Sequence, residues 1–400
     1  SLRNLGGLCC DLGDYTKGIR YQEQALQMLR TIYGDSTAHP EIAISLSNLR
    51  GAWDFLGDYR KALSYTEQVL QMYRSIYGGD TAHPDIATFI NNLGTAWWNL
   101  GDYRKAISYY EQALQMRRII YGQSTEHHGI AESLSSLGSA WFQLGDCTKA
   151  ISYHKQALIM QRSIYGQDTA HPHIAISLNQ LGEAWHGLGD YSEAISYYEQ
   201  ALQMYRSVYC QSTAHPLIAT SLNNLGATWD KLGDCTKAIS YHKQALQMQR
   251  SIYGQDTAHP HIAISLNQLG GAWCHLGDHM KAISYYEQAL QMYRSVYGQS
   301  TAHPAIATSL NNLGLAWDNL DDYMKAISYF EQALQMYWKI YGQSTAHPDI
   351  ARSLINLGAA WYRLGDLRKA ISLCQEALDM LRQIYPQDKN HPLIKASESN

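Results

Sequence analysis

Charged residues are scarce in this sequence, at 16% of 400 residues, and neither sign dominates. The 31 basic and 35 acidic residues are mixed along the whole length, so no basic stripe is available to neutralise phosphates. We therefore expect neither nucleic acid nor a membrane surface as a partner. Because 46% of the residues are hydrophobic, the composition indicates a folded, soluble chain rather than a disordered one.

Paired cysteines of the C-x-x-C type are also lacking. The seven cysteines are scattered, and their odd number favours free thiols that act as small hydrophobic residues in a reducing compartment. We therefore expect a cytoplasmic protein. No apolar run is long enough to span a bilayer, and no signal-like segment opens the chain.

Reactive constellations are missing as well. No nucleophile stands in a recognisable acid–base arrangement, and no glycine-rich loop could cradle a phosphate. We expect no enzymatic activity, no cofactor and no small-molecule substrate for this segment.

A strict 44-residue repeat is what the sequence does have. One marker is Gly-Asp, which begins at Gly13, Gly57, Gly101, Gly145, Gly189, Gly233, Gly277 and Gly365, with Asp321-Asp322 in the remaining slot. The other is His-Pro, at His39, His83, His171, His215, His259, His303, His347 and His391, with His127-His128 as the exception. Nine marker copies in one register predict a single array over residues 1–400. Ser1 falls inside a helix and Pro392 begins another, so we expect partial repeats at both ends and a longer parent protein.

Each repeat contains the pattern of two helices. In one repeat the apolar positions advance by four, three, four and three residues, as on one helical stripe: Ile86, Ile90, Leu93, Trp97 and Leu100. This helix A should begin at Pro84, where a missing N–H costs nothing. Asp102 is suited to cap helix B, which is predicted from about Tyr103 to Tyr121, with Gly122 as its stop.

One such hairpin has too little core to fold alone, so neighbouring hairpins must stack. We predict an all-α fold, an α-solenoid of antiparallel helix hairpins. Gly94 and Ala106 should permit close helix contact, while Trp97 and Tyr110 fill the volume between helices. The eight repeat tryptophans from Trp53 to Trp361 are expected in the core.

These residues resemble a known family. The pattern that resembles the tetratricopeptide repeat is Leu93-Gly94, Trp97, Gly101, Tyr103, Ala106, Tyr110 and Ala113. The period exceeds the usual ~34 residues, and the long form is similar to the repeats of kinesin light chains and nephrocystin-3-like proteins. The resemblance implies a superhelix whose concave groove is lined mainly by A helices, and a role in protein or peptide binding.

Asparagine is concentrated at two adjacent positions of helix A, which the resemblance places on or beside the groove. The first position holds Asn91, Asn179, Asn223, Asn267 and Asn311, and the second holds Asn48, Asn92, Asn224, Asn312 and Asn356. An amide offers a donor and an acceptor, so such a ladder could pair with the backbone of an extended peptide. The alternative is that these amides solvate helix A or bond between helices.

The residue after the repeated tryptophan varies where its neighbours do not. It is Asp54, Trp98, Phe142, His186, Asp230, Cys274, Asp318 and Tyr362 along the chain. Such variation is expected of a recognition position, although drift at an exposed site would look similar. Trp98 lies about 100° around the helix from Trp97, so we expect it to be exposed and to form an anchor patch with Phe142, beside Phe55. The alternative is that Trp98 packs against the neighbouring repeat.

The histidines of the His-Pro marker recur once in most repeats and could suggest a metal site. Equivalent histidines in stacked hairpins lie on the order of 10 Å apart, too far to share a metal ion, so we predict that they fix the loops.

The sequence also contains a longer duplication. Residues 144–231 closely resemble 232–319, so His154 and Gln161 have counterparts in His242 and Gln249.

Two functions follow from this organisation. The first is a scaffold or adaptor that binds partner proteins or extended peptides in a groove. The alternative is a ligand-sensing regulatory arm of a larger signalling NTPase or other multidomain protein.

Overall fold

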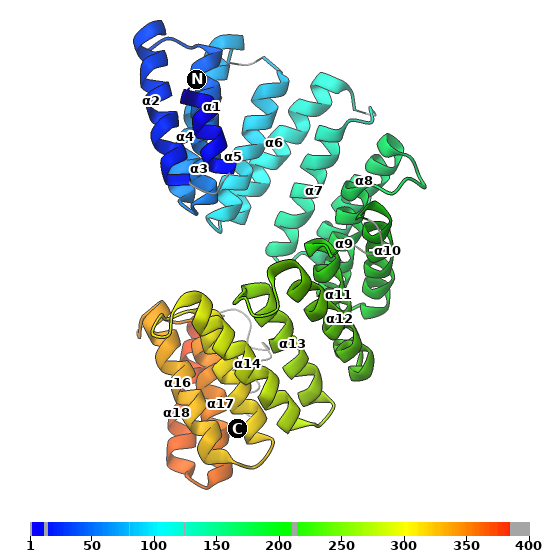
Figure 1. The fold of residues 1–400 in the computed structure, drawn as a ribbon, viewed down its shortest axis with the longest axis vertical. Coiled ribbons are helices and arrows are strands. Elements are labelled where there is room, and N and C mark those ends of the chain that lie inside the picture. The colour runs from blue at the N-terminus through cyan, green and yellow to red at the C-terminus, as the bar shows by residue number, and fades with distance from the viewer. Residues whose placement is uncertain are drawn as a thin grey trace. The chain divides into compact units, whose positions relative to one another are not determined.

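A computed structural model describes residues 2–11, 15–79, 81–123, 125–209, 214–343 and 345–384. Every regular element in these ranges is an α-helix, and successive helices pack as hairpins (Figure 1). The predicted all-α solenoid is therefore confirmed. No described helix is long and apolar enough to cross a membrane. The expected helix at Pro392 lies outside the described residues.

The first helix of each hairpin is called an A helix and the second a B helix. The A helices are α1 (Leu2–Asp11), α3 (Pro40–Phe55), α5 (Pro84–Asn99), α7 (His128–Gln143), α9 (Pro172–Leu188), α11 (Pro216–Leu232), α13 (Pro260–His275), α15 (Pro304–Asp318) and α17 (Pro348–Leu364). The B helices are α2 (Tyr15–Tyr33), α4 (Tyr59–Tyr77), α6 (Tyr103–Tyr121), α8 (Cys147–Tyr165), α10 (Tyr191–Tyr209), α12 (Cys235–Tyr253), α14 (His279–Tyr297), α16 (Tyr323–Tyr341) and α18 (Leu367–Ile384).

The chain divides into two compact units, residues 1–204 and 205–400. Each unit is described by itself, and a single array over 1–400 stays a prediction. Within each unit a B helix contacts both its own A helix and the next one. Successive A helices such as α5 and α7 also touch, whereas successive B helices do not touch in the described ranges. The A helices therefore lie closer together than the B helices.

Histidine begins most A helices. The Nδ1 atom of His83 accepts a hydrogen bond from the backbone N–H of Asp85 at 3.2 Å, and its ring stacks on Tyr77 with centroids 3.6 Å apart. The same stack recurs as Tyr33–His39, Tyr121–His127, Tyr165–His171, Tyr209–His215, Tyr253–His259, Tyr297–His303 and Tyr341–His347. The predicted loop-fixing role is confirmed by these contacts. Burial lowers the pKa of His215, which keeps its ring neutral and able to accept.

The Gly-Asp marker turns the chain and starts the B helix. Gly101 has φ 82°, a left-handed conformation that costs a glycine little. Asp102 Oδ1 accepts from the N–H of Lys105 at 3.1 Å, and the predicted bounds Tyr103–Tyr121 are those of α6. The Lys105 ammonium then lies 3.8 Å from the centre of the Trp97 ring.

Ring-on-glycine contacts close six of the hairpins, as predicted. A Cβ added to Gly94 would lie 2.6 Å from the Tyr110 ring, so any larger residue would push the helices apart. Equivalent pairs are Gly138–His154, Gly182–Tyr198, Gly226–His242, Gly270–Tyr286 and Gly314–Phe330. Burial raises the pKa of Tyr110 to about 12.

The tryptophans are less enclosed than predicted. Trp229 is half-buried and packs against the buried cluster of α12 and α13, while the Lys237 ammonium covers its other face, 3.7 Å from the ring centre. The fully buried core consists mainly of aliphatic residues and alanines such as Leu269 and Ala272, together with Phe330. The tryptophans pack against the core, but their burial was overestimated because apolar periodicity does not reveal that a lysine of the following helix will cover one face of the ring.

Asp321 is the exception among the turn residues, since it has φ 60° without being glycine. We expect Asp321→Gly to raise the free energy of unfolding by about 0.5–1 kcal/mol, because glycine relieves the left-handed strain. Urea unfolding measures the change. Gly277→Asp, at the same turn one repeat earlier, should lower stability by a similar amount. Equal stability of both variants and the parent would contradict the strain argument.

Two buried histidines should make the chain acid-sensitive. Burial lowers the pKa of His154 and of His242 to about 4, while an unfolded histidine titrates near 6.5. The unfolded chain therefore binds these protons first, so the stability is complete above about pH 6.5 and is lost as pH falls toward 4. Other repeats have tyrosine at this position, as Tyr110 and Tyr198. We expect the double variant His154→Tyr, His242→Tyr to abolish the acid-induced loss of stability, which is about 3 kcal/mol per histidine. Urea unfolding as a function of pH checks this, and an unchanged pH profile would exclude it.

Candidate ligand-binding face of the A helices

Each A helix leaves one stripe of side chains accessible, called here the A face. In α5 the stripe consists of Thr88, Asn92, Thr95 and Asn99, and the other A helices contribute the equivalent positions. The second asparagine position lies in the middle of this stripe. Asn48 is exposed, whereas the rest of that set are half-buried: Asn92, Asn224, Asn312 and Asn356. The intervening repeats have Ser136, Gln180 and Gln268 there, so every one of these A helices carries a hydrogen-bonding side chain at this point.

The first asparagine position instead connects successive A helices. Asn91 Oδ1 accepts from the Ser133 hydroxyl at 3.2 Å, 42 residues further along the chain. The other such bonds run from asparagine Nδ2 to serine Oγ: Asn223–Ser265 at 2.7 Å, Asn267–Ser309 at 3.0 Å and Asn311–Ser353 at 2.7 Å. Asn179 donates to Glu183 of its own helix at 2.9 Å. These contacts agree with the alternative that the sequence left open, and we do not include this set in the proposed binding surface.

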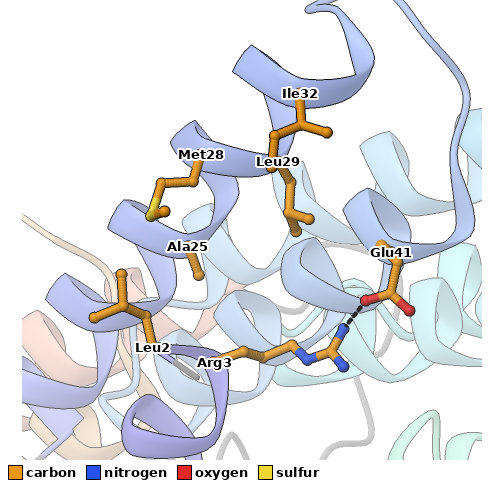
Figure 2. A pocket seen from close by; sticks show the side chains of 7 residues that line it. All are labelled: Leu2, Arg3, Ala25, Met28, Leu29, Ile32 and Glu41. Atoms are coloured by element: carbon orange, nitrogen blue, oxygen red, sulfur yellow. Dashed lines mark hydrogen bonds and ion pairs between the residues drawn. The ribbon is translucent and has the colours of Figure 1, made fainter.

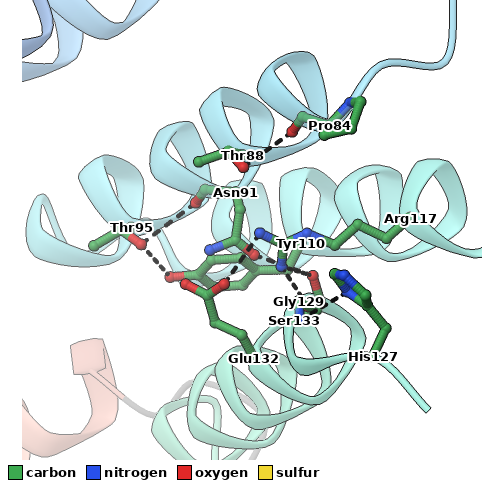
Figure 3. Close-up of polar contacts among 10 residues, drawn as sticks. All are labelled: Pro84, Thr88, Asn91, Thr95, Tyr110, Arg117, His127, Gly129, Glu132 and Ser133. Carbon is green, nitrogen blue, oxygen red and sulfur yellow. Dashed lines mark hydrogen bonds and ion pairs between the residues drawn. The ribbon is translucent and has the colours of Figure 1, made fainter. Parts of the chain in front are cut away.

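Around Asn91 the network contains a buried arginine that sequence reasoning missed (Figure 3). Arg117 is only 4% exposed and donates to the Gly129 carbonyl at 2.5 Å, to Ser133 Oγ at 2.7 Å and to Glu132 at 3.1 Å. A Cβ on Gly129 would lie 3.1 Å from Arg117 Nε. The Arg117 side chain therefore explains why a glycine stands at position 129, in the repeat that lacks the His-Pro marker. Its positive charge is paired with Glu132 of the same chain.

The varied position after the tryptophan pairs with a residue 45 positions later, on the next A helix. The observed pairs are Asp54–Asn99, Asp230–His275, Cys274–Asn319 and Asp318–Arg363. Phe142 lies over Gly187 in the same way, since a Cβ there would be 2.8 Å from its ring. Much of the variation that suggested ligand recognition thus has a structural cause, because five of the eight varied residues contact their neighbour in the next repeat.

The expected exposure of Trp98 is wrong. Its ring is half-buried, packs against the core cluster of α6 and α7, and meets Tyr103 edge-on at 6.2 Å, while its Nε1 is enclosed. The 100° offset failed as an argument because the neighbouring repeat covers that side of the helix as well. Phe55 is 74% exposed but stacks on Tyr15 at 5.2 Å, away from the Trp98 cluster.

The two remaining aromatic candidates differ from each other. His186 is half-buried and meets the Tyr191 ring edge-on at 5.3 Å. Tyr362, on α17, is 56% exposed and is the most accessible aromatic side chain at the position after the repeated tryptophan.

Hollows lie beside several of these helices, and two of them involve α1, α7 and α9. The first, of about 300 Å³, has aliphatic walls and an Arg3–Glu41 ion pair at its edge (Figure 2): Leu2, Ala25, Met28, Leu29 and Ile32. The second, of about 410 Å³, lies between α7, α8 and α9 and has polar walls that include His128, Glu132, Ser135, Gln161 and His173. The second opens among A-face residues such as Glu132 and Ser136. No group of three potential metal ligands is assembled in the described ranges.

The Asp318–Arg363 pair gives a test of the 45-residue matching. Burial raises the pKa of Asp318 against the lowering effect of Arg363, whose Nη1 lies 2.5 Å from Asp318 Oδ2. We expect Arg363→Leu to cost about 2–3 kcal/mol in urea unfolding at neutral pH, because it leaves a buried carboxylate unpaired. Adding Asp318→Asn should restore most of the loss. Arg352→Leu, which removes an exposed arginine from the same helix, should cost under ~0.5 kcal/mol; equal effects at both arginines would rule out the matching.

Tetratricopeptide repeat models match most of the sequence. One matches residues 1–75, 52–119, 85–163, 129–207, 261–339 and 319–383, and a second matches residues 218–261. No curated protein matches the sequence.

Several solved structures share the fold at low sequence identity. The apo form of the quorum sensor NprR from B. thuringiensis is 14% identical, with a TM-score of 0.61, covering 94% of this chain and 99% of that one. A Signal Transduction ATPase with Numerous Domains from Pyrococcus horikoshii, which has a tetratricopeptide repeat sensor, is 16% identical with a TM-score of 0.58; the match covers 97% of this chain and 54% of that one. Tetratricopeptide-like repeats of a putative kinesin light chain from Podosopora anserina are 20% identical with a TM-score of 0.46, covering 54% and 99%.

Proposed function

Because the chain belongs to the tetratricopeptide repeat family, we propose that it is a protein-binding scaffold whose A face holds extended segments of partner proteins. The observation that carries this proposal is the row of amides and hydroxyls at one constant position of the A helices. Asn92, Asn312 and Asn356 keep part of their side chains accessible there, although the adjacent asparagine position is used inside the fold.

The spacing of this row suits an extended ligand. Packed helices lie about 8–10 Å apart, and an extended chain rises about 3.3 Å per residue. Neighbouring amides would therefore meet every third residue of the ligand. An amide can accept from a backbone N–H or donate to a carbonyl, so this contact does not depend on the ligand's side chains. Residues that differ along the A face, such as Tyr362, would add sequence preference.

A regulatory arm is the second candidate. It is supported by the fold shared with the signal-transduction ATPase, whose tetratricopeptide repeats are described as its sensor. In that case the same face would bind the sensed ligand, and a phosphate-binding P-loop in flanking sequence would favour this role. We further propose that the protein acts in the cytoplasm and as an adaptor.

Substitution of the accessible amides tests the binding face. Peptides are first selected on the full chain from a random dodecapeptide library, and their affinity is measured by fluorescence anisotropy. We expect Asn312→Ala with Asn356→Ala to weaken binding about tenfold, roughly 1.4 kcal/mol, while the melting temperature changes little because both side chains are only half-buried.

The matched control is Gln335→Ala, which removes an exposed amide from the B helix α16. It should leave peptide affinity intact. Trp98→Ala should lower the melting temperature, since Trp98 belongs to the packing between α6 and α7. Undiminished affinity of the double asparagine variant, or failure to select any peptide, would count against the A face.

A further inference from the structure

A furrow separates two B helices of the second unit. Within the described ranges, α12 and α14 both contact α13 but do not contact each other (Figure 1). A hollow of about 270 Å³ lies in this furrow. Its walls include Arg250 and the loop residue Asp256 on one side, and Gln288, Gln291 and Ser295 of α14 on the other. None of its lining residues belongs to the A face, so the furrow is a separate surface.

The Arg250 guanidinium has no partner in this hollow. Its side chain is half-buried, and no ion pair or hydrogen bond joins it to any residue that the structure describes. Its Nε is enclosed, so the accessible part of the group is its Nη end. Arg117 and Arg363, by contrast, each have a carboxylate partner. A half-buried cation without a counterion favours an anionic ligand that can reach it.

The charge of α12 also differs from that of most B helices. Lys243 lies seven residues before Arg250, which is two turns along the same side of the helix. Its copy in α8 is Lys155. Six other B helices have glutamate at this position: Glu23, Glu67, Glu111, Glu199, Glu287 and Glu331. As a result α8 and α12 contain no acidic residue, whereas every other described B helix contains at least one.

Lys243 faces the next repeat, as its contact with Trp273 of α13 shows. Its ammonium lies 5.5 Å from the centre of the Trp273 ring, and the ammonium of Lys281 on α14 lies 4.2 Å from the same centre. Lys281 is also 2.6 Å from Asp278, which offsets its charge. Lys243 and Arg250 therefore remain as two cations of one helix that have no carboxylate partner in the described ranges.

We propose that the furrow between α12 and α14 is a second protein-binding surface, which takes an acidic segment of a partner protein. One aspartate or glutamate of the segment accepts hydrogen bonds from the Nη atoms of Arg250, and another pairs with Lys243. The two cations are about 10 Å apart along α12, the length of about three residues of an extended chain. Gln288 and Gln291 donate from their side-chain amides to the carboxylate at Arg250.

The limited extent of the basic surface favours a short acidic segment over a nucleic acid. The next two B helices have Glu287 and Glu331 at the position of Lys243, so the pattern of cations ends after one furrow. A nucleic acid strand carries a phosphate about every 3.4 Å, and the Asp256 carboxylate at the hollow would repel this density of charge. Two carboxylates three residues apart match the two cations without extending to these glutamates.

The first unit contains a natural control for this site. Lys155 and Arg162 have the same positions in α8, and the Arg162 Nε is likewise enclosed and unbonded. Lys155 lies 5.2 Å from the centre of the Trp185 ring. The position of Lys281, however, is Glu193 in this copy. This reversal of charge beside the same tryptophan should make the first copy bind an acidic segment more weakly.

A synthetic peptide tests the surface on the full chain. The probe is a fluorescein-labelled dodecapeptide with glutamate at every third position and glycine or serine between, and its control has glutamine in place of glutamate. Affinity is measured by fluorescence anisotropy at about 50 mM salt, where exposed charges are weakly screened. We expect Lys243→Glu with Arg250→Gln to weaken binding of the acidic peptide about tenfold. The glutamine peptide should not bind.

The matched control is Lys339→Glu, which makes the same charge change at an exposed lysine of α16. It should alter the affinity by less than about twofold. Glu193→Lys should add a second binding equivalent, because it gives the first copy the charges of the second. Should the double variant fail to fold, Lys243→Glu alone, at an exposed side chain, should still weaken binding about threefold and decides the question.

Other outcomes overturn the proposal. Equal affinity of the parent and the double variant excludes the furrow, and an equal loss in Lys339→Glu means that net charge alone attracts the peptide. If a single-stranded dodecanucleotide binds more tightly than the peptide and is lost in the same double variant, the occupant is a nucleic acid. Asn312→Ala with Asn356→Ala should leave the acidic peptide bound, so failure of the A face and failure of the furrow are measured separately.

Discussion

The stack of each loop histidine on the preceding tyrosine sets the position from which the next A helix starts. In the pair Tyr297–His303 the ring centroids are 3.6 Å apart, and the same imidazole caps α15 by accepting from the N–H of Ala305. One side chain thus ends a loop, orients a helix and fixes its register against the helix before it. Every contact between repeats, including those of serine with asparagine, requires that register. A polar loop can therefore be as decisive for a helical array as its apolar core.

Because the register is fixed, side chains on successive A helices meet as defined partners. The two adjacent asparagine positions of one A helix therefore have different roles. One asparagine position is used to join helices, while the adjacent one remains accessible. A shift of one residue, about 100° around the helix, separates a structural amide such as Asn311 from an accessible one such as Asn312. Constancy of a residue type along repeats therefore does not distinguish ligand contact from inter-repeat contact.

Local signals in the sequence predicted the helices well and the site less well. The bounds of α6 followed from an aspartate cap and a glycine stop, both of which act within a few residues. The bond of Asn91 to Ser133 and the burial of Trp98 depend on how separate hairpins dock, and periodicity within one helix contains no such information. The sequence does contain an acidic and a basic residue 45 positions apart, Asp318 and Arg363. Only the docked helices show that 45 residues is the spacing to compare. Arg117 was missed because a single arginine in a B helix is normally a solvent-exposed side chain.

The pairs between successive A helices also bear on how such a gene can change length. Unequal recombination between the near-identical segments would add or remove 88 residues at a time. Removal of residues 144–231 would place Phe142 opposite His275, where it now has Gly187, and a glycine-sized space would have to take an imidazole. A further copy of residues 232–319 would instead bring Asp318 opposite another His275, the acid–imidazole contact that Asp230 already makes. Loss of residues 232–319 would instead bring Asp230 opposite Arg363, an acid–base pair like that of Asp318, so the 45-residue pairing tolerates loss of one copy better than loss of the other.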